Sequence, residues 1–175
     1  MKLLLFIVIG VIAGIALLGG VIALIGSRLP QNHTASRSLL LHQSPEQVYA
    51  VVRDFASAPA WRSDVKRIDV HQRPGEPVRF LEEGKNGKVN FELVEDIPSR
   101  RMVTRILDTD LGYSGKWTYV FTPESGGTRV TITEDGEVSN VLFRFMSRYV
   151  FGHTATLDGY LISLAKRFGE NATPQ

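Results

Sequence analysis

The chain has 175 residues, enough for one globular domain with an appendage and for a core that needs no covalent staple. Its 20 Lys and Arg residues nearly balance 18 Asp and Glu residues, so the total charge does not indicate nucleic-acid binding. Because the chain has no Cys, disulfide frameworks and thiolate metal sites are excluded, and either side of a bacterial membrane suits it.

An uncharged apolar run begins at Leu3 and ends at Ile25. A helix of this length crosses a ~30 Å hydrocarbon core at about 1.5 Å per residue. The alternative is a secretory signal peptide, whose apolar region is usually only about 7–15 residues long. We therefore expect residues 1–28 to form an uncleaved, single-pass membrane anchor. The flanking charges are nearly balanced, and we expect the soluble part to lie outside the cytoplasm.

Within this run, Gly10 and Gly14 have the spacing that lets two membrane helices approach closely. The spacing predicts a weak homodimer through these two glycines. The simpler reading is that Gly and Ala are common in membrane spans.

A short polar tether, residues 29–34, is expected to lead into a first strand over residues 35–42. A helix should follow, because Ser44 can cap it, Pro45 suits its first position and Gln47 completes a capping box. From residue 64 onward the apolar pattern has a period of two, and an Asn86-Gly87 pair favours a hairpin. The expected strands cover residues 65–70, 78–83, 88–96, 102–108, 116–122 and 128–137.

The last expected element is one long amphipathic helix over residues 140–168, whose apolar residues recur by threes and fours. So wide an apolar stripe must lie across a sheet. Gly152 is the point at which this helix would break into two pieces. The soluble domain is expected to cover residues 35–169, followed by a tail over residues 170–175.

This order of elements resembles the START-like helix-grip superfamily, which includes polyketide cyclase/dehydrase and lipid-transport proteins. The resemblance covers most of the soluble part and rests on four stretches: residues 44–61, with Ser-Pro-Glu-Gln-Val-Tyr at their start and Pro59-x-Trp61 at their end; residues 115–119; residues 127–133; and residues 156–161. It implies an α+β fold in which a curved antiparallel sheet wraps around a long C-terminal helix. It also implies an apolar cavity between sheet and helix.

Residues facing such a cavity are the candidates for ligand binding, because a pocket for an apolar ligand needs apolar walls and a few polar tips. On the sheet side, Trp117 and Tyr119 flank Thr118 and therefore share one face. The full candidate set is Trp61, Phe80, Glu82, Phe91, Arg105, Trp117, Tyr119, Phe145, Met146, Tyr149 and His153. The alternative for each is that it packs in a filled core.

Among the polar candidates, Glu82 is in phase with Phe80, and Arg105 faces inward if Val103 does. A charged group inside a cavity is costly unless it is paired, so its presence would suggest ligand binding. The alternative is a strand phase that is off by one, with both residues solvated. His153 lies on the apolar stripe, where a hydrogen-bonded core histidine is more common than a catalytic base.

No recognisable catalytic constellation, phosphate-binding loop or metal-ligand spacing occurs in the sequence, so we expect no cofactor, no metal and no nucleic-acid partner. Arg144 and Arg148, four residues apart, form a basic strip that either faces solvent or faces anionic lipid headgroups. We expect a membrane-anchored protein that binds a hydrophobic small molecule or lipid. The alternatives are a cyclase or hydrolase that uses the same cavity, and an interaction module in which the cavity has collapsed.

Overall fold

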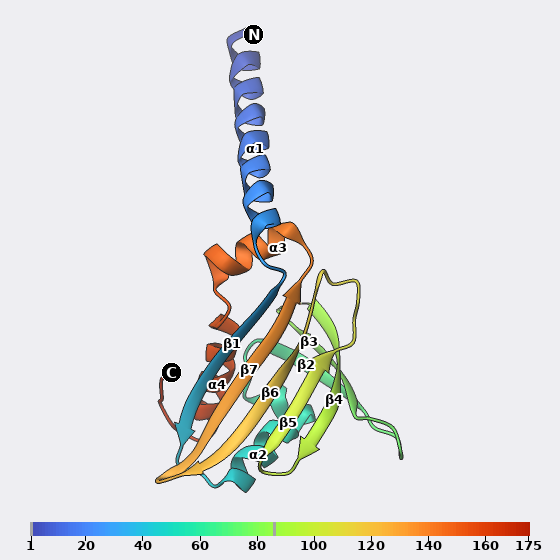
Figure 1. Ribbon diagram of the computed structural model, residues 1–175, viewed down its shortest axis with the longest axis vertical. Coiled ribbons are helices and arrows are strands. Elements are labelled where there is room, and N and C mark those ends of the chain that lie inside the picture. The colour runs from blue at the N-terminus through green and yellow to red at the C-terminus, as the bar shows by residue number, and fades with distance from the viewer. Residues whose placement is uncertain (1, 86) are drawn as a thin grey trace.

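The structure, a computed structural model, describes residues 2–85 and 87–175. Figure 1 shows a long helix standing at one end of a domain built on a seven-stranded antiparallel sheet. The strands are β1 (Asn32–Leu41), β2 (Val65–His71), β3 (Arg79–Gly84), β4 (Gly87–Ile97), β5 (Arg101–Ile106), β6 (Tyr113–Glu124) and β7 (Gly127–Val138). The helices are α1 (Lys2–Arg28), α2 (Pro45–Arg53), the 3₁₀ helix η1 (Phe55–Ala60), α3 (Val141–Met146), the π turn η2 (Ser147–Phe151) and α4 (Ala155–Arg167).

The strand order is β1-β7-β6-β5-β4-β3-β2, so β1 pairs with the last strand and not with the second. The segment from α2 to η1 makes the crossover between the two edges of the sheet. The helix predicted after Ser44 is present with its complete capping box, in which the Ser44 hydroxyl accepts from the Gln47 backbone N–H. Val48 and Val52 of α2 are buried in the core.

At both ends of the domain, the observed boundaries differ from the expected ones. β1 begins at Asn32, inside the predicted tether, because Asn32 pairs with Glu137 at the end of β7. The last residue, Gln175, exchanges both backbone hydrogen bonds with Ser38 at 2.9 Å, so the tail lies along the edge strand β1. Asn86 of the predicted hairpin lies outside the described residues, and the strands on either side of it pair antiparallel.

The predicted single C-terminal helix is divided into α3, the π turn η2 and α4, as expected from Gly152. Gly152 has φ 75° and ψ 156°, a conformation that essentially only glycine adopts. The two helical pieces therefore lie in different places: α4 lies along the sheet, whereas α3 lies across the foot of α1 (Figure 1). The buried face of α4 consists of Leu157, Tyr160, Leu161, Leu164 and Ala165.

The core fills the half of the domain away from α1. Leu41, Met102 and Leu164 are completely buried there, and α2 closes that end. Closer to α1, where β1 begins and β7 ends, inward-facing side chains such as Trp117 and Glu134 are only partly buried. Ala35 and Val138 are nevertheless buried at this end, so the concave face is packed along most of its length and is less covered only around Trp117 and Glu134.

Candidate functional site

The concave face carries a cluster of four aromatic rings centred on Tyr160 of α4. Its ring centroid lies 5.4 Å from that of Trp61, 5.8 Å from that of Trp117 and 5.8 Å from that of Tyr119. Strand alternation puts Trp117 and Tyr119 on the same side of β6, and the fold brings α4 against that side. We call these four residues the aromatic cluster. Burial raises the pKa of Tyr119 and Tyr160 above that of an ordinary tyrosine, so their hydroxyls ionise even less readily.

A second run of stacked rings continues the apolar surface across β3 and β4. The Phe80 ring stacks on Phe55 at 4.2 Å and on Phe91 at 5.2 Å. Phe80 and Phe91 are register partners, so the pairing of the two strands fixes this contact. Together with the aromatic cluster, these rings form a wall suited to a flat or extended apolar molecule.

A charged pair is embedded in this apolar surface. Arg62, in the turn before β2, donates from Nη1 to Oε2 of Glu82 at 2.8 Å, and from Nη2 to Oδ2 of Asp64 at 2.7 Å. Its guanidinium carbon also lies 5.2 Å from the Tyr160 ring centroid, within cation–π range. The Arg62 side chain is only 12% exposed, so its charge is largely shielded from water.

Two buried donors beside the aromatic cluster have no acceptor within the described residues. They are the indole Nε1 of Trp61 and the guanidinium Nε of Arg62. Buried polar groups in folded proteins are nearly always hydrogen-bonded, and an unpaired one costs free energy. Both nitrogens are covered by protein atoms, so a ligand oxygen could accept from them only after a side-chain movement that uncovers them.

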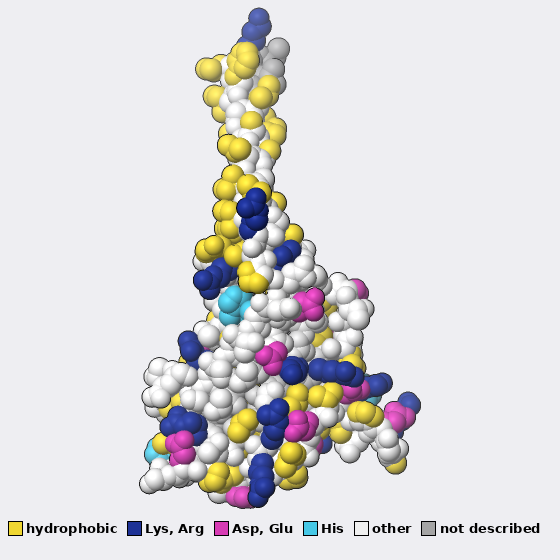
Figure 2. All heavy atoms as spheres, in the orientation of Figure 1, with side chains coloured by type: hydrophobic (Ala, Val, Ile, Leu, Met, Phe, Trp, Pro, Cys, Tyr) yellow, Lys and Arg dark blue, Asp and Glu magenta, His cyan; other side chains and the backbone are white. Residues whose placement is uncertain are grey.

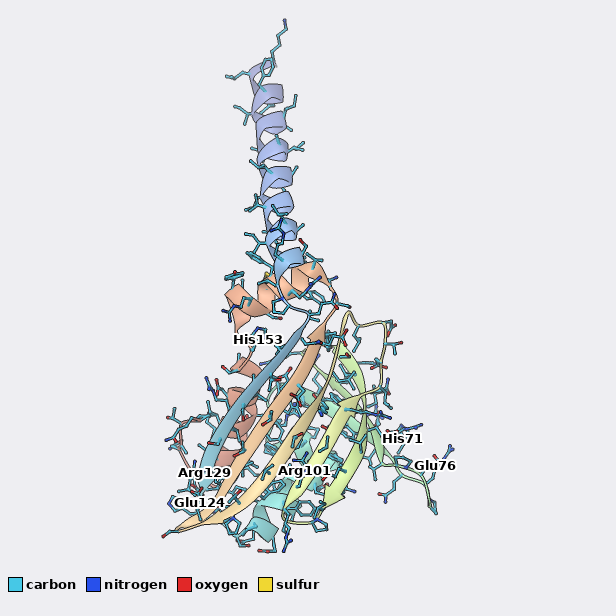
Figure 3. The ribbon with its side chains drawn as sticks, in the orientation of Figure 1. His71, Glu76, Arg101, Glu124, Arg129 and His153 are labelled. Atoms are coloured by element: carbon cyan, nitrogen blue, oxygen red, sulfur yellow. The ribbon has the colours of Figure 1, made fainter. Side chains whose placement is uncertain are left out.

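A second polar group lies at the end of the concave face nearest α1. The imidazole rings of His33 and His153 stack at 4.3 Å, and His33 Nε2 lies 3.5 Å from a carboxylate oxygen of Glu134. Figure 3 places His153 close under α3, beside the beginning of β1. Burial lowers the pKa of both histidines and raises the pKa of Glu134, although Trp117 and His153 oppose the rise. The contact therefore joins a neutral imidazole to a carboxyl group whose pKa lies nearer to neutrality than usual.

Two hollows among the described residues lie away from the aromatic cluster. The larger hollow, of about 630 Å³, is an open groove that lies mainly on the outer face of the sheet, opposite the concave face. Its lining residues include Thr34, Lys116 and Asp135. The smaller, of about 200 Å³, lies between α4 and the C-terminal tail. Between the sheet and α4 the aromatic rings contact one another and leave little space. A ligand on the concave face would therefore have to bind or enter near α1, where the face is less covered.

Six predicted site residues lie on the concave face or at its edge: Trp61, Phe80, Glu82, Phe91, Trp117 and Tyr119. Glu82 faces inward as its phase indicated, and His153 reaches the same region through its stack on His33.

Four predicted site residues are placed elsewhere. Arg105 is exposed on the outer face and pairs there with Glu92 at 2.8 Å, because β5 turns Met102 and Thr104 inward. Phe145, Met146 and Tyr149 belong to α3 and η2 at the foot of α1, because the chain changes direction at Gly152. The expected wall opposite the sheet is thus supplied by α4, with Tyr160 in place of Tyr149.

Sequence reasoning missed Arg62, His33, Glu134 and Tyr160 as site residues. Glu134 was detectable, since it alternates in phase with Val130 and Ile132 along β7. Within the described residues no group of three His, Cys, Asp or Glu side chains is arranged to hold a metal ion. By length and composition, α1 can cross a membrane.

Comparison with known sequences gives one family match. The model of the family described as "Polyketide cyclase / dehydrase and lipid transport" matches residues 32–160. A search of curated proteins found no match to the sequence.

Solved structures share the fold at low sequence identity. A START superfamily protein from Mycobacterium smegmatis is 17% identical, with a TM-score of 0.63, covering 77% of this chain and 96% of that one. The Zhui aromatase/cyclase from Streptomyces sp. R1128 is 11% identical, with a TM-score of 0.61, covering 78% and 96%. Norcoclaurine synthase from Thalictrum flavum is 10% identical, with a TM-score of 0.63, covering 80% and 88%.

Proposed function

Because the chain belongs to the polyketide cyclase/dehydrase and lipid transport family, we propose that its soluble domain binds a hydrophobic small molecule or lipid on the concave face of the sheet. We propose further that α1 holds the domain in a membrane. A protein tethered at a bilayer is placed where apolar ligands partition.

The observation that carries this proposal is the pair of unpaired donors on an aromatic wall. Trp61 Nε1 and Arg62 Nε are buried without acceptors in the described residues, beside rings that present apolar surface. A ligand with an apolar body and a carbonyl or carboxylate oxygen would supply the missing acceptor once a side-chain movement uncovers one of these donors. Such a molecule would enter from the end nearest α1, where the concave face is less covered.

Mass spectrometry of small molecules that co-purify with the detergent-solubilised full chain tests this function. A fluorescent fatty acid or polycyclic probe then measures uptake. Trp117→Ala, which removes one wall of the aromatic cluster, should reduce probe affinity about tenfold, equivalent to ~1.4 kcal/mol. Val94→Ala on the exposed outer face is the matched control and should leave uptake unchanged. Equal affinities for the wild type and Trp117→Ala would contradict binding on this wall.

An enzyme is the second candidate, because Glu134 has a raised pKa beside two neutral imidazoles. A raised pKa brings a carboxyl group closer to the range in which it can act as a general acid or base. A cyclase or hydrolase acting on an aromatic or polyketide-like substrate would use it as acid or base. In that case Glu134→Gln should still bind the co-purified ligand but fail to convert it. Absence of conversion by the wild type would leave binding as the function. Failure of the wild type to retain any ligand or probe would favour an interaction module.

The membrane side is tested by adding a single cysteine, since the natural chain has none. We propose that the domain lies outside the cytoplasm, so Glu76→Cys, in the exposed turn before β3, should react with a membrane-impermeant maleimide in intact cells. Labelling only after cell lysis would show that the domain faces the cytoplasm.

We also propose weak dimerisation through Gly10 and Gly14, where a side chain would meet no other atom of the chain. Gly14→Leu should weaken crosslinking of the full chain in membranes. Gly19→Leu, on another face of α1 with equal space, is the control. Equal crosslinking of the two variants would contradict the proposed dimer through Gly10 and Gly14.

A further inference from the structure

Residues 141–151, which comprise α3 and the π turn η2, form a short apolar segment at the foot of α1; we call it the collar. We propose that the collar lies in the headgroup layer of the same bilayer that α1 spans and seats the domain on the lipid surface. This inference rests on the proposed membrane anchor and adds a second membrane-binding element to it.

The collar is joined tightly to α1. A Cβ atom at Gly26 would collide with the carbonyl oxygen of Val141, so the two backbones are in direct contact. Arg144 of α3 is only 8% exposed and donates from Nη1 to the carbonyl of Leu29 at 2.9 Å, just beyond the end of α1. It also donates to the carbonyl of Ser139 at 3.4 Å. Arg144 is thus a clamp between α1 and the collar, whereas Arg148 is exposed.

The depth of the collar follows from the length of α1. At about 1.5 Å per residue, about 20 residues cross a ~30 Å hydrocarbon core. Counted from Leu3, the core ends near Ile22, and Gly26 lies about 6 Å farther along the helix. The polar layer on each side of the core is about 5–8 Å thick, so the contact between Gly26 and Val141 falls within it. Figure 1 shows α3 lying across α1 at this level.

The surface of the collar has the chemistry of an interfacial segment. Its exposed apolar residues are Leu142, Phe143, Tyr149 and Val150, between 44% and 60% exposed. Figure 2 shows hydrophobic side chains continuing from α1 to its foot, with Lys and Arg side chains at the same level. Exposed Arg28 and Arg148 supply positive charge there. Apolar and aromatic side chains beside cationic ones are typical of segments that lie in the membrane interface.

Exposure of this surface to water is unfavourable, because burying apolar surface lowers the free energy by about 25 cal/mol for each Å² removed from water. A protein partner is a second occupant in principle. We favour the bilayer because the collar is fixed to the lipid-facing helix at the depth of the headgroups.

Depth-dependent quenching in vesicles tests the position of the collar. Single cysteines at Leu142 or Tyr149 would carry an environment-sensitive fluorophore, in the full chain reconstituted into phosphatidylcholine/phosphatidylglycerol vesicles. Ile12→Cys reports on the middle of α1, and Val94→Cys reports on the outer face of the sheet, away from lipid. Lipids with a nitroxide at carbon 5 or carbon 12 of the acyl chain supply shallow and deep quenchers. The thermal midpoint of each labelled variant checks that it is folded.

We expect labels at positions 142 and 149 to be quenched at least twofold more strongly by the shallow nitroxide than by the deep one. The label at position 12 should show the opposite preference, and the label at position 94 should not be quenched. Deep quenching at position 12 with no quenching at 142 and 149 would overturn the collar alone and favour a protein partner for it. No quenching at position 12 would overturn the anchor, and the collar with it.

Discussion

Arg62 and Glu82 form a two-point contact between a turn and the third strand, with Nη1–Oε2 at 2.8 Å and Nη2–Oε1 at 3.1 Å. The two side chains are 12% and 20% exposed. This geometry positions the Arg62 guanidinium against the Tyr160 ring and leaves its Nε directed at no acceptor among the described residues.

Breaking this pair should destabilise the protein. Glu82→Leu leaves Arg62 with Asp64 as its remaining carboxylate partner, so we expect a loss of about 2–3 kcal/mol, below the ~3–5 kcal/mol typical of fully buried pairs. Adding Arg62→Leu should recover part of the loss, because it removes the uncompensated charge. Urea unfolding of both single variants and the double variant measures the coupling. Glu83→Leu, the more exposed neighbour, should change stability by no more than ~0.5 kcal/mol. Additive losses would mean that the pair contributes no coupling.

Trp61→Phe should separate binding from stability. The variant keeps an aromatic ring and removes a buried donor that has no acceptor in the described residues, so its stability should equal or exceed that of the wild type. If the donor orients a ligand oxygen, affinity for a fatty-acid probe should fall about fivefold to tenfold, or ~1.0–1.4 kcal/mol. Thermal melting and probe titration give the two values. Lower stability with unchanged affinity would show that the lost part of the indole ring packs in the fold and that its nitrogen orients no ligand.

Glu134→Gln should change how stability depends on pH. Burial raises the pKa of Glu134 in the folded protein, so ionising it opposes folding. The resulting loss of folding stability is absent below the pKa of Glu134 in the unfolded state. It develops as pH rises through the higher pKa of Glu134 in the folded state. The glutamine variant should therefore melt above the wild type at pH 7 and close to it near pH 4. Thermal midpoints across this range test the sign, which a variant less stable at pH 7 would contradict.

Gly152→Ala tests whether the break between α3 and α4 depends on the glycine at this position. Alanine strongly disfavours φ 75° and ψ 156°, so the substitution should cost about 1–3 kcal/mol. Gly159→Ala is the matched control, because Gly159 lies inside α4 with open space at its Cβ position. That change should stabilise the protein by about 0.5–1 kcal/mol. Chemical denaturation of both variants is the measurement. Similar effects of the two substitutions would mean that the break does not depend on glycine.

The sequence predicted the inward phase of β3 and β6, because Phe80 of β3 shares its phase with Glu82, and Trp117, Tyr119 and Phe121 alternate along one face of β6. Its prediction for β5 failed at Arg105, since apolar residues occupy both faces of that strand. The phase of β5 relative to the sheet follows from pairing with β4, which is irregular between Leu93 and Glu95. A contact of this kind is not encoded within the strand itself.

The long apolar stripe at the C-terminus misled for a different reason. Spacing reports that side chains avoid water and does not report what covers them. Tyr160 of α4 contacts the sheet, whereas Phe145 of the same periodic pattern belongs to α3, which meets α1 where Val141 contacts Gly26. The Arg62–Glu82 pair joins residues twenty positions apart through a turn, which periodicity also cannot reveal.

The close contact of Gly26 with the Val141 backbone also limits how the domain can move. Only residues 29–31 separate α1 from β1, and the Arg144 clamp closes that joint, so the domain cannot swivel freely about the end of α1. In a bilayer such a protein would rotate only about the membrane normal, as one rigid body with its helix. The less covered part of the concave face would keep a constant orientation relative to the lipid surface during lateral diffusion. The encounter with a membrane-dissolved ligand would then become a search in two dimensions instead of three.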